Sequence, residues 1–378
     1  MNILFVMVEM GMGGSERLVH NLALRLDRGR FNPSVAWLVG RQALKEFEDL
    51  QVPLHYVPKS TRVDFSTMQQ LARIIERERI DVVNAQHFMP AIYAYYGCKL
   101  AAKKALVFTA HSRWEIEDTS LKWRVAGGYL LRRIDASVGV SPDVSAAIQS
   151  VFKTNASQTV TIENGVDTDL FGREKDVQSL RGNLGLTDRD IVIGIVGNLK
   201  KVKNHLLLLQ AFAKIAEELE SVKLLIVGRG SMVESDDTED DLRLFVDNHR
   251  LAERVSFLGY RTDIAELLQV MDVYCITSLR EGLPLGLMEA MAAGLPVIGT
   301  NVQGIRDVIT QDVDGVLVEL GNVTALKNAL LGLIRDERWR NKLGRAGHEK
   351  VIQKYSLQRC VNEYEQLFLS LAKASVAR

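Results

Sequence analysis

The chain has 378 residues, of which 47% are hydrophobic and 25% are charged, a composition that excludes disordered and collagen-like chains. Lysine and arginine together number 47, as do aspartate and glutamate, so the overall charge provides no attraction for nucleic acid. At roughly 100 to 200 residues per domain, the length favours two domains.

The cysteines and the first apolar run indicate where the protein works. Cys98, Cys275 and Cys360 lie far apart, without CxxC or Cys/His spacing, which argues for a reducing compartment and against structural zinc. The run 3–8 ends at Glu9 and is too short for a signal peptide or a spanning helix, so it predicts a buried strand. We expect a cytoplasmic protein without a membrane-spanning segment.

Short β-branched runs alternate with helical patterns along the chain, which predicts parallel sheets built from βαβ units. Six strands are expected in the first half, at residues 3–8, 34–39, 81–85, 106–109, 136–140 and 159–162. After a polar stretch, six more are expected at residues 191–197, 223–227, 255–258, 273–277, 296–300 and 315–318. The predicted fold class is α/β, with two doubly wound domains in tandem and a boundary near residues 164–168, where turn residues gather.

Charge is distributed unevenly between the two halves. Residues 1–160 hold 20 lysines and arginines against 15 aspartates and glutamates. The segment Tyr96 to Ile134 holds eight basic residues against three acidic ones, interleaved with Trp114 and Trp123. This segment is either a surface for anionic lipid or a phosphate-bearing acceptor, or simply a solvated helix over 121–133. The acidic run 234–241 predicts a solvated loop or helix start.

Two glycine-rich loops follow predicted strands. Gly13 and Gly14 open a helical pattern and form a candidate anion cradle at a helix N-terminus. A dinucleotide fingerprint would need glycine where the sequence has Glu16. Gly228 and Arg229, after the strand that ends at residue 227, form a second candidate loop, and no P-loop sequence occurs. The alternative for each loop is a tight turn that binds nothing.

The segment 280–298 is the most informative part of the sequence. It follows the predicted strand 273–277, at the edge where open α/β sheets bind ligands. Glu281 stands before a helix and Glu289 about one turn inside it, so the two carboxylates can reach a sugar hydroxyl and a ribose. We expect Glu281 to be an exposed loop carboxylate whose removal changes stability by under about 0.5 kcal/mol. Free N–H groups at the helix start could hold a diphosphate. The turn consists of Gly282, Leu283, Pro284, Leu285 and Gly286.

Glu281, Glu289 and the Ala-Met-Ala-Ala-Gly-Leu-Pro-Val sequence after them resemble the signature of retaining, nucleotide-sugar-dependent glycosyltransferases of family 4, which have the GT-B fold. Other pieces agree in order: Gly13-Gly14-Ser-Glu16, His111, Val140-Ser141, Asn164-Gly165-Val166-Asp167, Lys203, Val227-Gly228-Arg-Gly230 and Phe257-Leu258-Gly259. The resemblance implies two Rossmann-like domains facing each other across a cleft. The acceptor side would be 1–165, completed by a final helix 356–378 that crosses back, and the donor side would be 166–355.

The resemblance also implies roles for particular residues. Lys203 matches the phosphate-binding lysine, and Asn198 stands where the family has an arginine, so one expected charge is missing. Lys200, Lys201 or Arg280 are candidates to replace it. Glu281 matches the residue that holds donor-sugar hydroxyls, Glu289 the ribose contact, and His111 a histidine near the reacting centre. The N–H groups of Leu285 and Gly286 would meet the phosphates, and His87 is a candidate for the acceptor side.

The implied activity is retaining transfer of a hexosyl group from a UDP- or GDP-sugar to a glycan or lipid-linked acceptor, in cell-envelope polysaccharide or lipopolysaccharide synthesis. No cofactor and no obligatory metal are implied, so Asp167, Asp169, Asp312 and Asp314 are interpreted as turn residues. Peripheral contact with anionic membrane through Tyr96 to Ile134 is a further expectation. The alternatives are a catalytically silent nucleotide-sugar-binding module, and an epimerase or phosphorylase on the same architecture.

Overall fold

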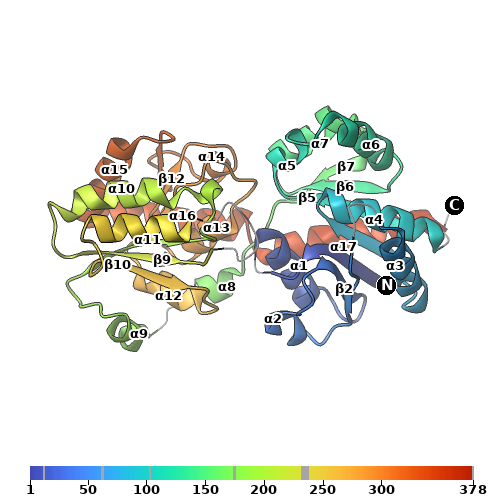
Figure 1. Cartoon of the computed structure of the whole chain (residues 1–378), viewed down its shortest axis with the longest axis horizontal. Coiled ribbons are helices and arrows are strands. Elements are labelled where there is room, and N and C mark those ends of the chain that lie inside the picture. Colours follow the sequence, from blue (N-terminus) through green and yellow to red (C-terminus); the bar gives the residue numbers. More distant parts are fainter. Residues whose placement is uncertain (12, 61–63, 102–103, 173–175, 231–237, 377–378) are drawn as a thin grey trace. The chain divides into compact units, whose positions relative to one another are not determined.

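The computed structural model describes residues 1–11, 13–60, 64–101, 104–172, 176–230 and 238–376. The chain divides into two compact units (Figure 1). The first unit comprises Met1–Gly165 together with Leu357–Arg378, and the second comprises Val166–Ser356. Among the described residues, no helix combines the length and the apolar character needed to cross a bilayer.

The first unit is built on a parallel sheet of seven strands in the order β3-β2-β1-β4-β5-β6-β7. The strands are β1 (Asn2–Glu9), β2 (Asn32–Val39), β3 (Leu54–Tyr56), β4 (Val82–Gln86), β5 (Ala105–Ala110), β6 (Ala136–Gly139) and β7 (Thr159–Thr161). Their central residues are buried on both sides, as expected for a parallel sheet covered by helices.

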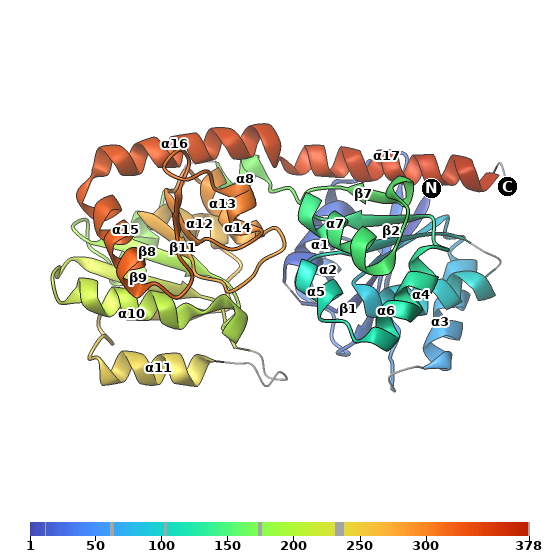
Figure 2. The same ribbon diagram turned by 90° about the horizontal axis from the view of Figure 1, so that it is seen from above.

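Helices cover both faces of this sheet. One face carries α1 (Gly14–Arg25), α2 (Lys45–Glu48) and α17 (Leu357–Val376), which share one apolar core (Figure 2). The other face carries α3 (Phe65–Arg77), α4 (Phe88–Leu100), α5 (Arg113–Glu117), α6 (Leu121–Leu131) and α7 (Pro142–Phe152) (Figure 1). The 3-10 turn η1 (Ala156–Gln158) precedes β7.

Helix α17 completes the core of the first unit. Tyr364 and Phe368 are fully buried, and the ring of Phe368 meets that of Phe5 edge-on, with ring centroids 6.3 Å apart. Cys360 and Val361 belong to the same apolar cluster. The expectation that the final helix crosses back to the first domain is therefore confirmed.

The second unit has a parallel sheet of six strands in the order β10-β9-β8-β11-β12-β13. The strands are β8 (Ile191–Val196), β9 (Val222–Val227), β10 (Val255–Gly259), β11 (Val273–Ile276), β12 (Val297–Thr300) and β13 (Val316–Val318). One face packs against α10 (His205–Ala216), α11 (Glu239–Asn248) and α15 (Val323–Arg335). The remaining elements are α8 (Thr168–Phe171), α9 (Gln178–Asn183), η2 (Lys201–Lys203), α12 (Ile264–Val270), α13 (Leu285–Ala292), α14 (Ile305–Val308) and α16 (Glu337–Lys354).

The twelve strands expected from the sequence are all present, and β3 is an additional one among the described residues. Strand β3 is only three residues long, Leu54-His55-Tyr56, and pairs with β2 alone, at the edge of its sheet. Leu-His-Tyr alternates in polarity, but three residues are too few for such an alternation to predict a strand. The predicted α/β fold with two Rossmann-like units is otherwise confirmed.

The strand orders explain where each unit can bind a ligand. In the first unit β1 lies between β2 and β4, so the loops after β1 and β4 lead to opposite sides of the sheet. In the second unit β8 lies between β9 and β11, and the same reversal occurs. Such a switch point opens a crevice outside the carboxyl ends of the strands. The loops after β1, β4, β8 and β11 are therefore the places to look for a site.

Candidate functional site

Lys203 and Glu281 form an ion pair at the switch point of the second unit. Lys203 follows β8 and Glu281 follows β11, and Lys203 Nζ lies 2.6 Å from Glu281 Oε1. Ser278 Oγ donates to the same carboxylate oxygen at 2.6 Å. A cation and an acid, both expected to contact the donor, are thus brought together from positions 78 residues apart.

Backbone contacts hold the two loops in place. The amide of Leu279 donates to the carbonyl of Val202 at 2.8 Å, and Thr277 Oγ1 donates to the carbonyl of Asn204 at 3.0 Å. Gly304, with φ +83°, packs directly against the loop that carries Glu281. A Cβ at position 304 would lie 2.7 Å from the carbonyl oxygen of Glu281. Only glycine allows such close approach with this backbone conformation.

The expectation that Glu281 is an exposed loop carboxylate is wrong. Its side chain is only 11% exposed and has both Lys203 and Ser278 as partners. The sequence places Glu281 in a loop, but the loop folds onto the segment after β8, which propensity and periodicity do not reveal. Removing this carboxylate therefore costs more stability than the loss of a surface charge.

Helix α13 begins at Leu285, directly beyond this ion pair. Its N-cap is Pro284, and no described side chain caps the helix, so the first amides point outward as expected for a helix start. Gly286 packs over the hydroxyl of Tyr274, which a Cβ would approach to 2.9 Å. Glu289, in the second turn, is 4% exposed, and burial together with the Glu289 charge raises the pKa of Tyr274.

The loop after β9 joins the same group. Gly228 has φ +142°, and a Cβ there would lie 2.0 Å from the carbonyl oxygen of Gly197. The amide of Leu199 donates to the carbonyl of Arg229 at 3.1 Å, which places Asn198 and Arg229 side by side, both exposed. The guanidinium of Arg229 lies 5.5 Å from the ring centroid of Tyr260. Lys200, Lys201 and Arg280, the cations considered as replacements at Asn198, lie on the loops that carry Lys203 and Glu281.

A second polar group forms at the switch point of the first unit. The rings of His87, after β4, and His111, after β5, lie with centroids 4.8 Å apart. Glu115 of α5 holds both: its Oε2 lies 2.9 Å from His87 Nδ1 and accepts from the His111 amide at 3.5 Å. Its Oε1 accepts from the amide of Phe88 at 3.1 Å. One carboxylate thus ties together three chain segments.

His111 is held as a neutral ring. Its Nε2 lies 2.8 Å from Gln86 Oε1, and the amide group of Gln86 in turn donates to Asn84 Oδ1. Asn84 Nδ2 donates to Thr109 Oγ1 at 3.1 Å. This chain of bonds assigns the proton of His111 to Nε2. Loss of water around the ring, with His87 nearby, lowers the pKa of His111 well below its ordinary value.

The pKa of His87 is shifted in the opposite direction to that of His111. Burial favours its neutral form, but the charge and hydrogen bond of Glu115, with Glu16 adding to them, raise the pKa of His87 above its ordinary value. His87 also has φ +70°, a conformation that is uncommon for residues other than glycine. Strained backbone of this kind persists where the surrounding structure holds it, often at functional sites.

Gly13 and Gly14 lie at the start of α1 in the first unit. Gly13 is the N-cap, and the carboxylate of Glu16 folds back over it, since a Cβ at Gly13 would lie 2.6 Å from Glu16 Oε2. Ser15 Oγ donates to the same oxygen at 2.9 Å. The expected cradle therefore already holds a carboxylate of the chain itself.

The structure thus forms two groups among the expected residues. In the second unit it brings together Asn198, Lys203, Gly228, Arg229, Glu281, Gly282, Leu283, Pro284, Leu285, Gly286 and Glu289. In the first unit it places His111, Gly13 and Gly14 at the ends of β5 and β1. Sequence analysis missed Gln86, Glu16 and Glu115 as parts of the histidine group. The one available signal was that Glu115 stands one helical turn after His111.

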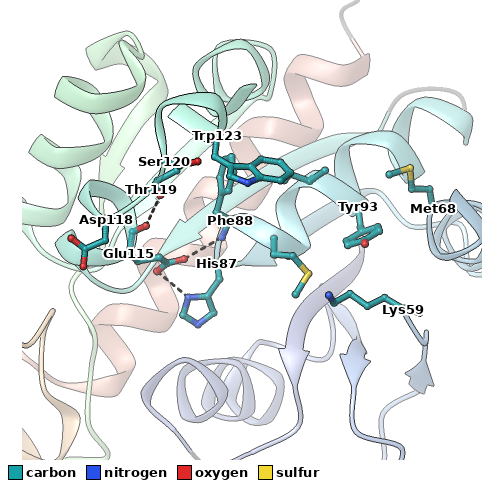
Figure 3. A pocket seen from close by; sticks show the side chains of 12 residues that line it. Lys59, Met68, His87, Phe88, Tyr93, Glu115, Asp118, Thr119, Ser120 and Trp123 are labelled. Atoms are coloured by element: carbon teal, nitrogen blue, oxygen red, sulfur yellow. Dashed lines mark hydrogen bonds and ion pairs between the residues drawn. The ribbon is translucent and has the colours of Figure 1, made fainter. Parts of the chain in front are cut away.

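A pocket of about 550 Å³ opens beside the histidine group, entirely within the first unit (Figure 3). Its lining residues are Lys59, Met68, His87, Phe88, Met89, Ile92, Tyr93, Glu115, Asp118, Thr119, Ser120 and Trp123. In Figure 3, Trp123 lies above Phe88, and Lys59 extends beneath Tyr93 with its ammonium turned inward. A volume in this range is typical of small-molecule sites. His87 was a candidate for the acceptor side, and Glu115, Asp118, Thr119, Ser120 and Trp123 lie in the segment Tyr96 to Ile134 that the sequence offered as a surface for lipid or a phosphate-bearing acceptor; the other lining residues were not selected from the sequence.

The aspartates that resemble a metal motif act as local structural groups. Asp167 caps α8 by accepting from the amide of Leu170 at 3.0 Å. Asp314 accepts from the amide of Thr310 and pairs with Lys350 at 2.8 Å. Of the charged segments singled out in the sequence, residues 102–103 and 234–237 lie outside the described residues, and α11 begins at Glu239.

Two family models match the chain in tandem. "Glycosyltransferase Family 4" matches residues 12–170, and "Glycosyl transferases group 1" matches residues 176–350. Each match covers nearly the whole of one α/β unit. The chain belongs to the group 1 glycosyltransferases of the family 4 type, and its architecture is GT-B.

Relatives of known activity match over most of the chain. N-acetyl-alpha-D-glucosaminyl L-malate synthase of Bacillus anthracis is 27% identical, over 86% of this chain and 84% of the relative. UDP-Gal:alpha-D-GlcNAc-diphosphoundecaprenol alpha-1,3-galactosyltransferase of Escherichia coli is 26% identical, over 87% and 86%. Both are sugar transferases or synthases by name, in keeping with the family.

Solved structures share the fold. HepE of Anabaena, in complex with UDP-glucose, superposes with a TM-score of 0.87 at 22% identity, covering 98% of this chain and 100% of HepE. WaaG, a glycosyltransferase involved in lipopolysaccharide biosynthesis, has a TM-score of 0.76 at 15% identity, over 97% of this chain and 99% of WaaG. At these identities the likeness establishes the GT-B fold and nothing about substrates.

Proposed function

We propose that this glycosyltransferase moves a hexosyl group, with retention of anomeric configuration, from a UDP- or GDP-sugar to a hydroxyl of a glycan or lipid-linked acceptor in cell-envelope polysaccharide or glycolipid synthesis. The observation that carries the proposal is the Lys203–Glu281 pair at the switch point of the second unit. The name of the Escherichia coli relative, with UDP-Gal and a diphosphoundecaprenol-linked sugar in it, supports a UDP-sugar donor and a lipid-linked acceptor as the substrate classes.

The chemistry of the second unit supports a nucleoside diphosphate as the leaving group. Departure of the diphosphate concentrates negative charge, which a cation and oriented N–H dipoles stabilise. Lys203 supplies the cation, and the uncapped start of α13 at Leu285 supplies the amides. Glu281 is proposed to turn from Lys203 to the donor-sugar hydroxyls when the phosphate takes the lysine, and Glu289 to contact the ribose.

The first unit is proposed to bind the acceptor. A neutral His111 offers a fixed hydrogen-bonding group at the end of β5, because its bond to Gln86 sets the tautomer. We assign no carboxylate nucleophile. Retention is proposed to proceed by departure and attack on the same face of the sugar, with the leaving phosphate accepting the proton of the acceptor hydroxyl.

The test is a donor panel. Release of UDP, GDP or ADP is measured for UDP-, GDP- and ADP-sugars, with and without a cell-envelope lipid extract, for the wild type and for Glu281→Gln. We expect one donor to be turned over, faster with the extract, and turnover to fall about 10²-fold or more in Glu281→Gln. Nucleotide binding without release from any donor would overturn the proposal in favour of a binding module.

Retention and metal independence have their own measurements. The anomeric coupling constant of the product, followed by proton NMR from the first turnover, should match that of the donor, and an inverted product would contradict retention. Turnover should persist in EDTA, because Lys203 and the α13 amides are proposed to carry the charge stabilisation. Loss of turnover in EDTA that Mg²⁺ restores would contradict metal independence.

We also propose that α6 contacts an anionic membrane surface. Leu121, Val125 and Tyr129 are 76%, 67% and 50% exposed, and their i, i+4, i+8 spacing places them on one face of the helix. Lys122 and Arg124 lie between them in the sequence. Flotation with phosphatidylglycerol vesicles should fall with salt and in the double variant Leu121→Ser, Val125→Ser. Flotation that is absent, or indifferent to both changes, would refute the contact.

A further inference from the structure

The pocket of the first unit has two chemically different regions. Phe88 and Trp123 meet edge-on with ring centroids 6.2 Å apart, and Phe88 also stacks on Phe152 at 5.6 Å. These rings, with the almost fully buried Tyr93 and Met68, make a stiff apolar wall. In Figure 3 the wall occupies the centre, top and right of the pocket, and the polar groups lie at its left and lower sides.

Lys59 and His87 lie along the lower side of this wall. The half-buried Lys59 has no ion pair or hydrogen bond through its ammonium among the described residues, and this group turns into the pocket (Figure 3). His87 has Nδ1 engaged by Glu115, and Nε2, on the other side of the ring, is the nitrogen that would donate to an anion when the ring carries a proton there. The carboxylate of Glu115 is occupied by His87 and by the amide of Phe88, and Asp118 lies beyond it at the left edge.

The pocket lies next to exposed apolar surface. Trp123, which lines it, is the third residue of α6, the helix whose side chains Leu121 and Val125 are 76% and 67% exposed. An apolar chain leaving the pocket past Trp123 would therefore remain in contact with apolar side chains. A glycan would cover this wall only with the C–H face of a sugar ring, whereas an alkyl or isoprenyl chain would cover both the wall and the apolar side chains beyond it and would bury more apolar area.

We propose that this pocket binds the lipid phosphate part of the acceptor, an isoprenyl or alkyl phosphate, with the phosphate between Lys59 and His87 and the first part of the chain against Phe88, Tyr93 and Trp123. The inference rests on the proposed function, because it names the acceptor class of that activity. It assigns to Lys59 the role of selecting an anionic acceptor, and to the aromatic wall that of selecting a lipid-linked one.

Direct binding tests the pocket without any donor. Farnesyl phosphate and farnesol are titrated into the full chain by calorimetry, below their micelle concentrations. Farnesyl phosphate should bind about tenfold or more tightly than farnesol, because a charge-assisted contact is added. Lys59→Gln should weaken farnesyl phosphate binding, with the contact to His87 remaining, and leave farnesol binding unchanged.

Two tryptophan substitutions separate the pocket from the surface. Met89 is a half-buried lining residue in the first turn of α4, so Met89→Trp fills the pocket and should abolish binding of both ligands. Leu24, 49% exposed on α1, lies outside the pocket, so Leu24→Trp should bind both as the wild type does. Farnesyl phosphate binding that survives Met89→Trp, or that does not exceed farnesol binding in the wild type, would overturn the inference.

The outcome for the pocket is independent of the outcome for the proposed function. UDP and GDP binding should be the same in Met89→Trp and the wild type, because the proposed donor site lies in the second unit. Fluorine NMR of fluorotryptophan-labelled protein, read at Trp37, Trp114 and Trp123, shows that the first unit of the variant is folded. If donor turnover is stimulated equally by extract in both proteins, the pocket is not the acceptor site and the transferase proposal stands. If the wild type turns over no donor, the transferase proposal fails while the farnesyl phosphate titration still decides the pocket.

Discussion

The Lys203–Glu281 pair allows stability and activity to be separated in one set of variants. The set consists of Lys203→Met, Glu281→Gln and the double variant, compared with the wild type. The pair is neither a surface contact nor a fully buried one, since its side chains are 31% and 11% exposed. Each substitution keeps the approximate size of the side chain and removes the charge.

The expected coupling follows from this intermediate burial. Exposed ion pairs contribute about 0 to 1 kcal/mol, and breaking a buried pair costs about 3 to 5 kcal/mol. We therefore expect a coupling of roughly 1 to 2 kcal/mol between Lys203 and Glu281. Lys203→Met should be the more destabilising single change, because it leaves a shielded carboxylate with Ser278 as its remaining neutral donor.

The assay must report on the second unit alone, because a chain of two compact units need not unfold in one step. Trp339 is the only tryptophan of residues 166–356, and it packs beside the core of that unit. Urea titrations followed by fluorine NMR of fluorotryptophan-labelled protein therefore give its free energy of unfolding. Nucleotide release is measured in parallel, at a temperature where every variant is folded.

Two results would refute this reasoning. A coupling below about 0.3 kcal/mol would show that the 2.6 Å contact has no energetic weight, as for many surface pairs. Full turnover in a folded Glu281→Gln variant would show that the carboxylate is structural and that the donor site lies elsewhere. We expect Glu281→Gln to lose turnover, and the variant set to give a coupling of roughly 1 to 2 kcal/mol between Lys203 and Glu281.

Three further predictions concern other parts of the molecule. Gly228→Ala should destabilise the second unit by roughly 3 kcal/mol, because residue 228 has φ +142° and a Cβ there would lie 2.0 Å from the carbonyl oxygen of Gly197. The control Gly182→Ala adds a Cβ in open space on α9 and should be neutral or stabilising in the same urea titration. Burial lowers the pKa of His205 to about 3, so protonation of the unfolded chain below pH 6.5 should remove roughly 2 kcal/mol of stability at pH 5. His205→Leu should abolish this loss, and an unchanged pH dependence would contradict it. Glu115→Gln should lower the pKa of His87, seen as a lower titration midpoint of its ring proton by NMR; an unmoved midpoint would show that another group sets it.

The fold was largely predictable from the sequence because parallel strands buried on both faces produce continuous apolar runs. The runs at β1, β8 and β9 are of this kind. Strand β3 was not predictable, because an edge strand of three residues is too short to produce a recognisable hydrophobic pattern. The crossing of α17 back to the first unit came from family resemblance, because periodicity alone shows an amphipathic helix and not its partner.

The candidate sites were predictable in their residue types but not in their environments. The positions of Lys203 and Glu281 after two strands placed both at one sheet edge. Their mutual pairing depends on how the loops after β8 and β11 meet, which involves contacts 78 residues apart. Glu115 was missed for the same reason: its partner His87 follows a different strand, and an acid in a short helix has no distinctive pattern.

The position of α17 in the first unit bears on how the protein is synthesised. Residues 166–356 form a continuous compact unit, and they are translated before residues 357–376. The second unit can thus fold as it leaves the ribosome. The core of the first unit is complete only after Tyr364 and Phe368 have been translated and packed beside Phe5. Nascent chains stalled after residue 356 should expose this apolar surface to chaperones and proteases, so the first unit folds completely only on chains extended through α17.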